Sequence, residues 1–254
     1  MASRSQRSVV MELLEDGFGR ADRSVFERLV AEDYIQHNPF MPPGRAGLVG
    51  LLEELQRIPD NRFIPLRTLE DGDLVLVHSE WIPAGRKRAV FDLFRLRDGL
   101  LVEHWDAMQE QPLASGRTMV DGPTAMKDLE QTAANKALVA RFLDAAFVSG
   151  QLEALHGFFA GDHYLQHSPG IEDGLSGFVS HLKGLAARGV SLRYERIHRV
   201  IGEGHFVFTQ SEGELGGERM AFYDLFRVED GKLAEHWDVH QPIPDTMTHG
   251  NGMF

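Results

Sequence analysis

Two histidine–aspartate pairs in this chain have the spacing of an acid–base site. His104 and Asp106 lie two residues apart in the sequence EHWD, and His236 and Asp238 repeat that sequence and spacing. Side chains alternate across a β-strand, so residues two apart project from the same face. An imidazole titrates near neutral pH, and a neighbouring carboxylate can orient it and stabilise its charged form. We therefore predict that both pairs are catalytic, with a structural polar cluster as the alternative.

A third acidic residue precedes each pair. Asp92 shares a predicted strand face with Phe94 in the sequence FDLFRL. A carboxylate beside a phenylalanine in an apolar strand is costly unless it is paired or protonated. One interpretation is an ion pair with an arginine such as Arg95 or Arg67. The other is a catalytic, neutral carboxylic acid that donates a hydrogen bond to a developing oxyanion, with Phe94 against the substrate.

A histidine and a polar residue stand just before a proline in the sequence YIQHNP. His37 is a candidate catalytic base, Tyr34 and Asn38 are candidates for substrate contact, and His78 is a further polar candidate. The three histidines His37, His78 and His104 could instead bind zinc or iron with one of the aspartates. Their spacing fits no short metal motif, so we predict no metal.

These motifs occur twice, at the spacing of a whole domain. FDLFRLRDGLLVEHWD recurs as FYDLFRVEDGKLAEHWD, with Trp105 and Trp237 132 residues apart, and YIQHNP recurs as YLQHSP. Solenoid repeats are roughly 20 to 50 residues long, so this period indicates a tandem duplication of a domain. The second copy supplies equivalent candidates, which are His167, Asp224, His236 and Asp238 for catalysis and Tyr164, Gln210 and Phe226 for substrate contact.

Each copy begins with helical patterns and ends in strands. The first copy has helical patterns over residues 8–18, 24–34 and 48–58, followed by strand patterns that include 91–106 around an Arg-Asp-Gly turn. Helices before antiparallel strands are the order of an α+β fold. A segment with Ser, Gly and Pro separates the copies, which gives domain 1 at 1–113, a linker at 114–134 and domain 2 at 135–254.

The composition restricts the partners. The chain has 254 residues and a formal charge of −12, so its field repels phosphate backbones and anionic membrane surfaces. It has no cysteine, which excludes disulfides, thiolate catalysis and zinc sites built on cysteine. The first residues lack the apolar core of a signal peptide, and no run has the length of a membrane span. We expect a cytoplasmic protein whose partner is a small molecule, with neither nucleic acid nor membrane as a partner.

Through these motifs and the terminal GNGMF, the chain resembles the SnoaL-like branch of the nuclear-transport-factor-2-like (NTF2-like) superfamily, in particular small proteins predicted to catalyse aldol condensations. The resemblance covers nearly all of both copies. It implies two tandem cone domains, each a curved antiparallel sheet wrapped around helices to form a pocket. Such domains commonly dimerise through the sheet, which suggests an intrachain pseudo-dimer, either monomeric or within a higher homo-oligomer. The apolar end of GNGMF suggests that the tail docks on the protein.

The resemblance also implies a function without any cofactor. It indicates an acid–base enzyme acting next to a carbonyl, as an aldol-type cyclase, dehydratase or isomerase on a small hydrophobic, polyketide-like substrate. Ketosteroid isomerases are similar in fold, and Asp92 falls where they carry the oxyanion-binding acid. SnoaL-type cyclases have an acid–base aspartate on the late strands, which matches Asp106. The alternatives are a non-catalytic small-molecule binding module and an epoxide hydrolase, which would call for an Asp-Arg-Asp arrangement.

The two copies differ in residue type at three equivalent positions. The first has Asn38, His78 and Trp81 where the second has Ser168, Gln210 and Gly213. If catalysis needs a second imidazole, the first copy is the active one.

Overall fold

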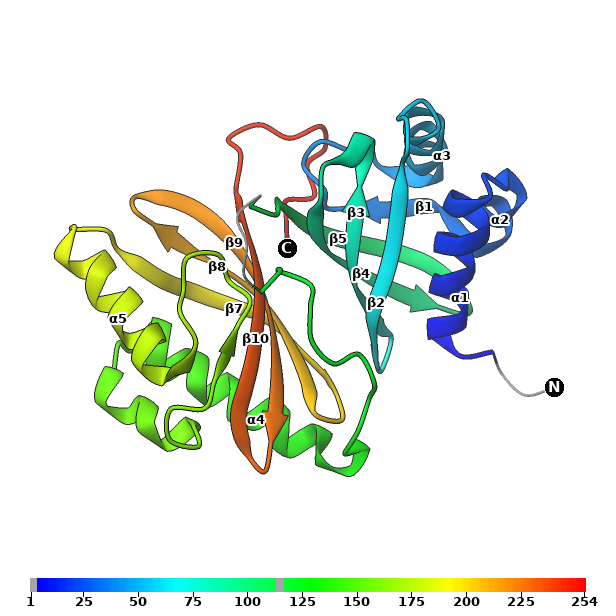
Figure 1. Cartoon of the computed structure of the whole chain (residues 1–254). Coiled ribbons are helices and arrows are strands. Elements are labelled where there is room, and N and C mark those ends of the chain that lie inside the picture. The colour runs from blue at the N-terminus through cyan, green and yellow to red at the C-terminus, as the bar shows by residue number, and fades with distance from the viewer. Residues whose placement is uncertain (1–3, 113–116) are drawn as a thin grey trace. The chain divides into compact units, whose positions relative to one another are not determined.

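The computed structural model describes residues 4–112 and 117–254 of the chain, in two compact units. Unit 1 consists of Met1–Glu110 and Pro244–Phe254, and unit 2 of Gln111–Ile243. The tail of the chain therefore belongs to unit 1, although it follows the second copy in sequence. Each unit has one five-stranded sheet with helices beside it (Figure 1), as predicted for two α+β domains.

Unit 1 begins with helices and continues with a five-stranded sheet in which β2 to β5 pair antiparallel. The strand order is β1-β5-β4-β3-β2. Its elements are α1 (Gln6–Glu12), the π-helix η1 (Leu13–Gly19), α2 (Arg23–Leu29), β1 (Val30–Gln36), α3 (Gly44–Leu55), β2 (Arg62–Asp71), β3 (Leu74–Ile82), the 3₁₀-helix η2 (Pro83–Gly85), β4 (Arg88–Arg97) and β5 (Leu100–Glu110).

Strand β1 corrects the predicted helix over residues 24–34. Helix α2 starts at the Asp22 cap, whose side chain accepts from the backbone N–H of Ser24, and it stops at Val30, which has an extended backbone. β1 then pairs in parallel with β5, with Gln36 opposite His104. The sheet is thus not wholly antiparallel, and Pro39 follows a strand rather than a helix. This pairing brings the first sequence motif beside the second.

Unit 2 repeats the plan with a reduced first strand. The strand order β6-β10-β9-β8-β7 matches that of unit 1. Its elements are the 3₁₀-helix η3 (Leu129–Gln131), α4 (Thr132–Leu143), the π-helix η4 (Asp144–Val148), the 3₁₀-helix η5 (Leu152–Phe158), β6 (Leu165–Gln166), α5 (Gly174–Ala187), β7 (Leu192–Glu203), β8 (Phe206–Leu215), β9 (Glu218–Glu229) and β10 (Lys232–Pro242).

Tight turns set the register of the strands that carry the candidate residues. Asp98 and Gly99 both have positive φ between β4 and β5, as the predicted turn requires. The resulting register places Asp92 opposite Asp106 and Phe94 opposite His104. A turn of the same kind places Asp224 opposite Asp238 in unit 2.

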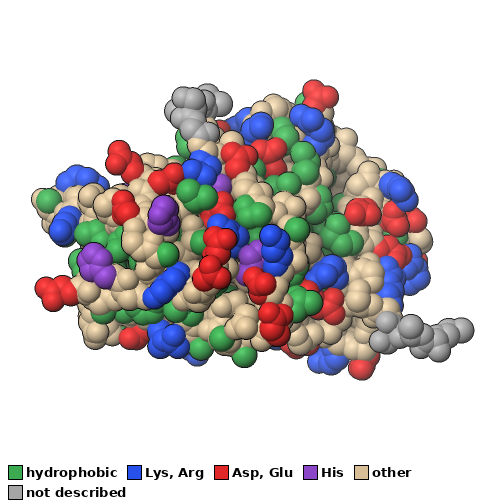
Figure 2. Space-filling model, turned by 60° about the horizontal axis from the view of Figure 1, so that its bottom comes forward, with side chains coloured by type: hydrophobic (Ala, Val, Ile, Leu, Met, Phe, Trp, Pro, Cys, Tyr) green, Lys and Arg blue, Asp and Glu red, His purple; other side chains and the backbone are tan. Residues whose placement is uncertain are grey.

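Each unit has its own apolar core. Trp105 and Trp237 are completely buried, on the opposite strand face from the neighbouring histidine and aspartate. On the face in Figure 2, acidic, basic and hydrophobic side chains are interspersed. Within the described residues, no helix has the length and apolar character needed to cross a membrane.

Candidate active site

Unit 1 contains a cavity of about 670 Å³, a size typical of small-molecule sites. Its wall comes from η1, α3 and the cavity-facing side of the sheet. Most of the lining is apolar, for example Leu13, Phe18, Leu52, Phe63, Val90 and Met108. The predicted residues Asp92, His104 and Asp106 all line this cavity. A small polar cluster therefore lies in the wall of a mostly hydrophobic cavity.

The hydrogen bonds of His104 fix where its ring protons lie. Its Nδ1 is 3.0 Å from Oε1 of Gln36, and this oxygen also accepts from the backbone N–H of Asn38 at 2.9 Å. Because Oε1 is an acceptor, Nδ1 of His104 is the donor. Nε2 lies 3.1 Å from Oδ1 of Asp92, so these two atoms share one further proton.

This geometry changes two of the predicted pairings. Asp92 is paired with His104 and not with Arg95 or Arg67, and His104 is hydrogen-bonded to Asp92 rather than to Asp106. Burial lowers the pKa of His104, but the hydrogen bond that it donates to Asp92 and the charges of Asp106 and Asp92 outweigh burial and raise it. The neighbouring carboxylates therefore favour the protonated, cationic form of the imidazole.

One oxygen of the Asp106 carboxylate has no hydrogen-bond partner among the described residues. Its Oδ2 accepts from Nδ2 of Asn38 at 2.8 Å, while Oδ1 has no hydrogen-bond partner among the described residues. Burial raises the pKa of Asp106, and the negative charge of Asp92 adds to this, against the opposing effects of His104 and Asn38. A carboxylate with a raised pKa is a stronger base than an exposed aspartate.

Two further oxygens of the cluster lack partners. Among the described residues, nothing bonds to Oη of Tyr34 or to Oδ2 of Asp92, although both atoms are buried. Burial, together with the charges of Asp92 and Asp106, raises the pKa of Tyr34 well above its usual range, so its hydroxyl stays a donor. Tyr34 and Asn38 line the cavity, as does Phe94, whose ring centroid is 4.6 Å from that of His104.

His37 and His78 are corrections to the predicted site, because neither lines the cavity. His37 stacks on Trp105 with a centroid separation of 4.8 Å, and its Nε2 is 2.9 Å from Oε1 of Glu103. Glu103 is also ion-paired with Arg95, on the side of the sheet opposite Asp106. His78 stacks on Phe91 at 4.3 Å, on that same opposite side.

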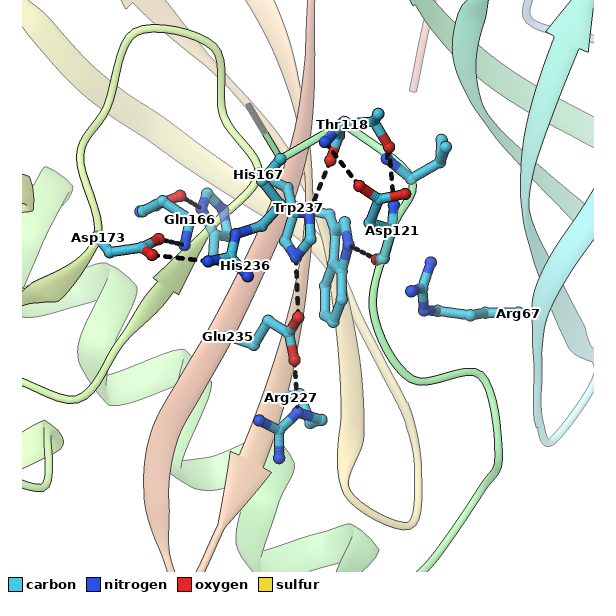
Figure 3. Close-up of polar contacts among 12 residues, drawn as sticks. Arg67, Thr118, Asp121, Gln166, His167, Asp173, Arg227, Glu235, His236 and Trp237 are labelled. Atoms are coloured by element: carbon cyan, nitrogen blue, oxygen red, sulfur yellow. Dashed lines mark hydrogen bonds and ion pairs between the residues drawn. The ribbon is translucent and has the colours of Figure 1, made fainter. Parts of the chain in front are cut away.

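The histidine of the YIQHNP motif instead anchors a segment from elsewhere in the sequence. Nδ1 of His37 donates to the backbone oxygen of Gly252 in the tail, at 3.0 Å. In unit 2, Nδ1 of His167 donates to the backbone oxygen of Thr118 at 2.7 Å (Figure 3). His167 also binds Glu235 at 2.8 Å. His167 thus has the same kind of contacts as His37, and its catalytic role stays a prediction.

A second side chain also binds the segment that contains Thr118, the residue to which His167 donates. Nε1 of Trp237 donates to the backbone oxygen of Asp121 at 2.8 Å, and Oε2 of Glu235 accepts from Arg227 at 2.8 Å (Figure 3). Glu235 binds His167, and Trp237 binds the same segment as His167 does. These contacts are a structural reason why the histidine motif and the EHWD motif recur together. The joint recurrence of the two motifs is visible in the sequence. The sequence does not show that these side chains bind backbone oxygens of residues far away along the chain.

The second copy keeps the candidate residue types, but the side chain of Tyr194 lies against them. His236 bonds Gln166 at 3.0 Å and Asp224 at 3.1 Å, as its counterpart does in unit 1. The hydroxyl of Tyr194 also donates to Asp224, at 3.1 and 3.2 Å from its two oxygens. Tyr194 is only 3% exposed. Tyr164 and Phe226 lie against His236, whereas Gln210 bonds Tyr223 on the other strand face.

A glycine explains how Tyr194 enters that space. Gly213 occupies the strand position of Trp81, and a Cβ there would lie 2.0 Å from the backbone oxygen of Arg193. β7 has a bulge after Tyr194 that has no counterpart in β2. Without a tryptophan, the backbone of β7 approaches β8 and directs the tyrosine onto Asp224.

The cluster also meets the spacing of a metal site, since Asp92, His104 and Asp106 each offer an atom within 4.8 Å of the others. Both ring nitrogens of His104 are already hydrogen-bonded, however. A cation would have to replace the proton between His104 and Asp92. Metal-free chemistry stays our prediction.

Comparison with known proteins identifies the repeated domain. The model of the SnoaL-like domain matches residues 10–104 and again residues 139–236. No curated protein matches the chain.

Several solved structures are similar. Wild-type IdmH, a proposed polyketide cyclase from Streptomyces antibioticus, is 25% identical over 41% of this chain and 92% of its own, with a TM-score of 0.36. TsrD from Streptomyces laurentii is 21% identical over 42% of this chain and 91% of its own, with a TM-score of 0.37. A proposed ketosteroid isomerase from Kribbella flavida is 22% identical over 48% of this chain and 91% of its own, with a TM-score of 0.37.

Proposed function

The chain belongs to the SnoaL-like domain family, in two tandem copies, and from this premise we propose that unit 1 is a cofactor-independent acid–base enzyme acting next to a carbonyl. The observation that carries the proposal is Asp106, a buried carboxylate that lines a mostly apolar cavity and whose Oδ1 has no hydrogen-bond partner among the described residues. General bases of this kind contribute most when burial brings their pKa towards the working pH.

Asp106 removes a proton from the carbon next to the substrate carbonyl. The electron pair left on that carbon moves into the carbonyl and forms an enolate. The hydroxyl of Tyr34 donates a hydrogen bond to the enolate oxygen and keeps its proton, because the pKa of Tyr34 is raised. The cationic ring of His104, held by Gln36 and Asp92, supplies positive charge beside the reacting atoms.

The fate of the enolate decides the reaction class. In an isomerase, Asp106 returns the proton to a different carbon. In an aldol-type cyclase, the enolate carbon attacks a second carbonyl of the same molecule, and the new alkoxide takes the proton from Asp106. The mostly apolar lining supports a small hydrophobic, polyketide-like substrate for either reaction.

The epoxide hydrolase alternative has less support. That reaction calls for an arginine between two aspartates, but Arg95 is ion-paired with Glu103 and stacks over Trp105 at 5.1 Å. A binding module remains the second candidate, because an apolar cavity alone serves for binding.

The test is exchange of hydrogen for deuterium next to the carbonyl. The protein is incubated in D₂O with simple β-diketones and β,γ-unsaturated cyclic ketones, and exchange is followed by proton NMR. We expect exchange above the buffer rate, and its loss in Asp106→Asn. Binding of these ketones without any exchange would overturn the enzyme proposal and favour the binding module.

A further inference from the structure

One charged side chain in the cavity wall takes no part in the proposed chemistry. Arg88 begins β4 and lines the cavity together with Val90 and Asp92, which lie on the same strand face. Its guanidinium carbon lies 5.1 Å from the ring centroid of Trp81, a cation–π distance. Trp81 is held by a 2.7 Å hydrogen bond from its Nε1 to Asn61, which also lines the cavity.

No carboxylate of the described part of the chain forms an ion pair with this arginine, although its charge contributes to lowering the pKa of Glu110. The only hydrogen-bond acceptor of its guanidinium there is the thioether of Met108, 3.5 Å from Nη1, and a thioether is a weak acceptor. Glu110 lies opposite Arg88 in strand register but is ion-paired with Arg86. The other lining cation, Arg20, is paired with Asp16 at 2.6 Å.

The second copy has no such cation. Strand register places Met220 at the position of Arg88, opposite Gly213 instead of Trp81. The copy whose catalytic residues are covered by Tyr194 therefore also lacks the arginine and its supporting tryptophan. The arginine and its supporting tryptophan therefore occur together in the unit with the described cavity.

We propose that Arg88, supported by Trp81, is a subsite for a carboxylate group on the substrate. A guanidinium presents two parallel N–H donors that match the two oxygens of a carboxylate, and the aromatic face and low local polarity strengthen the pairing. The apolar wall between this subsite and the cluster then holds a hydrocarbon body. The inference rests on the proposed function only in taking the bound acid to be the substrate.

The position of Arg88 also restricts the substrate's shape. Asp92 lies four residues further along β4 than Arg88, which is roughly 13 Å at about 3.3 Å per residue. A molecule that engages both ends is elongated, with its carboxylate at one end and its reacting carbonyl towards the other. This class includes open-chain keto acids and excludes compact neutral ketones as the preferred substrates.

The test compares acids with matched neutral molecules by isothermal titration calorimetry of the full chain. Decanoate and dodecanoate are the probes, and the corresponding primary alcohols are the controls. We expect each acid to bind at least about tenfold more tightly than its alcohol, the scale of a charge-assisted hydrogen bond. Arg88→Met, which installs the residue of the second copy, should remove the difference, and Arg88→Lys should retain part of it.

A second variant separates this inference from the proposed reaction. Asp106→Asn should leave the ratio of acid to alcohol affinity unchanged, because binding at Arg88 needs no proton transfer. Failure of deuterium exchange with an intact affinity ratio would overturn only the enzyme proposal. An equal affinity for acid and alcohol, or a ratio that survives Arg88→Met in a folded protein, would overturn the carboxylate subsite.

Discussion

Asp238 forms an ion pair with His240, with 3.0 Å between Oδ2 and Nε2. Burial raises the pKa of Asp238, but His240 and His236 outweigh burial and lower it far below its usual range. Asp106, at the equivalent position in unit 1, has Met108 instead of a histidine two residues later, and its pKa is raised. The pKa of the same residue type is thus lowered in one copy and raised in the other.

This difference predicts unequal effects of two matched substitutions. Asp106→Asn should lower kcat/KM by roughly a hundredfold or more, since a positioned base contributes on that order. Asp238→Asn should leave kcat/KM nearly unchanged, because Tyr194 covers Asp224 beside it. The measurement is kcat/KM of each variant at equal folded fraction, judged by circular dichroism. Equal losses from the two variants would indicate two working sites and contradict the asymmetry.

The pH profile of kcat/KM should be bell-shaped, with both limbs displaced to higher pH. Asp106 acts when ionised, so activity should rise with pH through a pKa above the ordinary aspartate value of about 3.9. His104 acts as a cation, so activity should fall through a pKa above the ordinary histidine value of about 6.5. His104→Gln should remove the alkaline limb. An alkaline limb that persists in this variant would assign it to another group.

Asn38 offers a way to move the acid limb alone. Its hydrogen bond to Asp106 stabilises the carboxylate and so lowers the pKa of that group. Asn38→Leu should therefore shift the acid limb to higher pH, with little effect on the alkaline limb. Asn38→Ser is the matched control, because Ser168 of the second copy hydrogen-bonds to Asp238 and lowers its pKa. An acid limb unmoved by Asn38→Leu would exclude Asp106 as the base.

Much of the fold could be predicted from repetition and strand patterns, but the partners of individual side chains could not. Alternation along the strand correctly placed His104 with Asp106 and away from Trp105. Whether His104 binds Asp92 or Asp106 depends on the pairing of β4 with β5 and on Gln36 from β1, a strand whose sequence has a helical pattern. Local periodicity does not report which strands become neighbours.

Two other features could not be predicted from sequence patterns, for physical reasons. The role of His37 depends on the backbone oxygen of Gly252, which carries no sequence signal. The covering of the second site depends on a bulge after Tyr194, made possible by Gly213. The docking of the tail was predicted from its apolar end and is confirmed, since Met253 is 3% exposed.

The tail should position the candidate site from outside the cavity. Its residues bond backbone oxygens of the segment that carries Gln36 and Asn38: Asn251 Nδ2 donates to the oxygen of Gln36 at 3.0 Å, and His249 Nε2 to that of Asn38 at 2.8 Å. Thr248 adds a bond from its backbone N–H to Pro39 at 2.9 Å. The segment would lose these restraints if the tail were removed, and Asn38 would then hold Asp106 less well.

Deletion of residues 248–254 should therefore lower kcat/KM by at least about tenfold, because a small misplacement of catalytic groups is costly. Each lost hydrogen bond should also remove about 1 kcal/mol from the stability of unit 1. Thr246→Ala, in the exposed part of the tail before the docked residues, is the control and should change neither quantity. The acid limb of the deletion variant should move to higher pH, as in Asn38→Leu, if the tail acts through Asn38. A variant that loses melting temperature but keeps its kcat/KM and its pH profile would show that the tail only stabilises the fold.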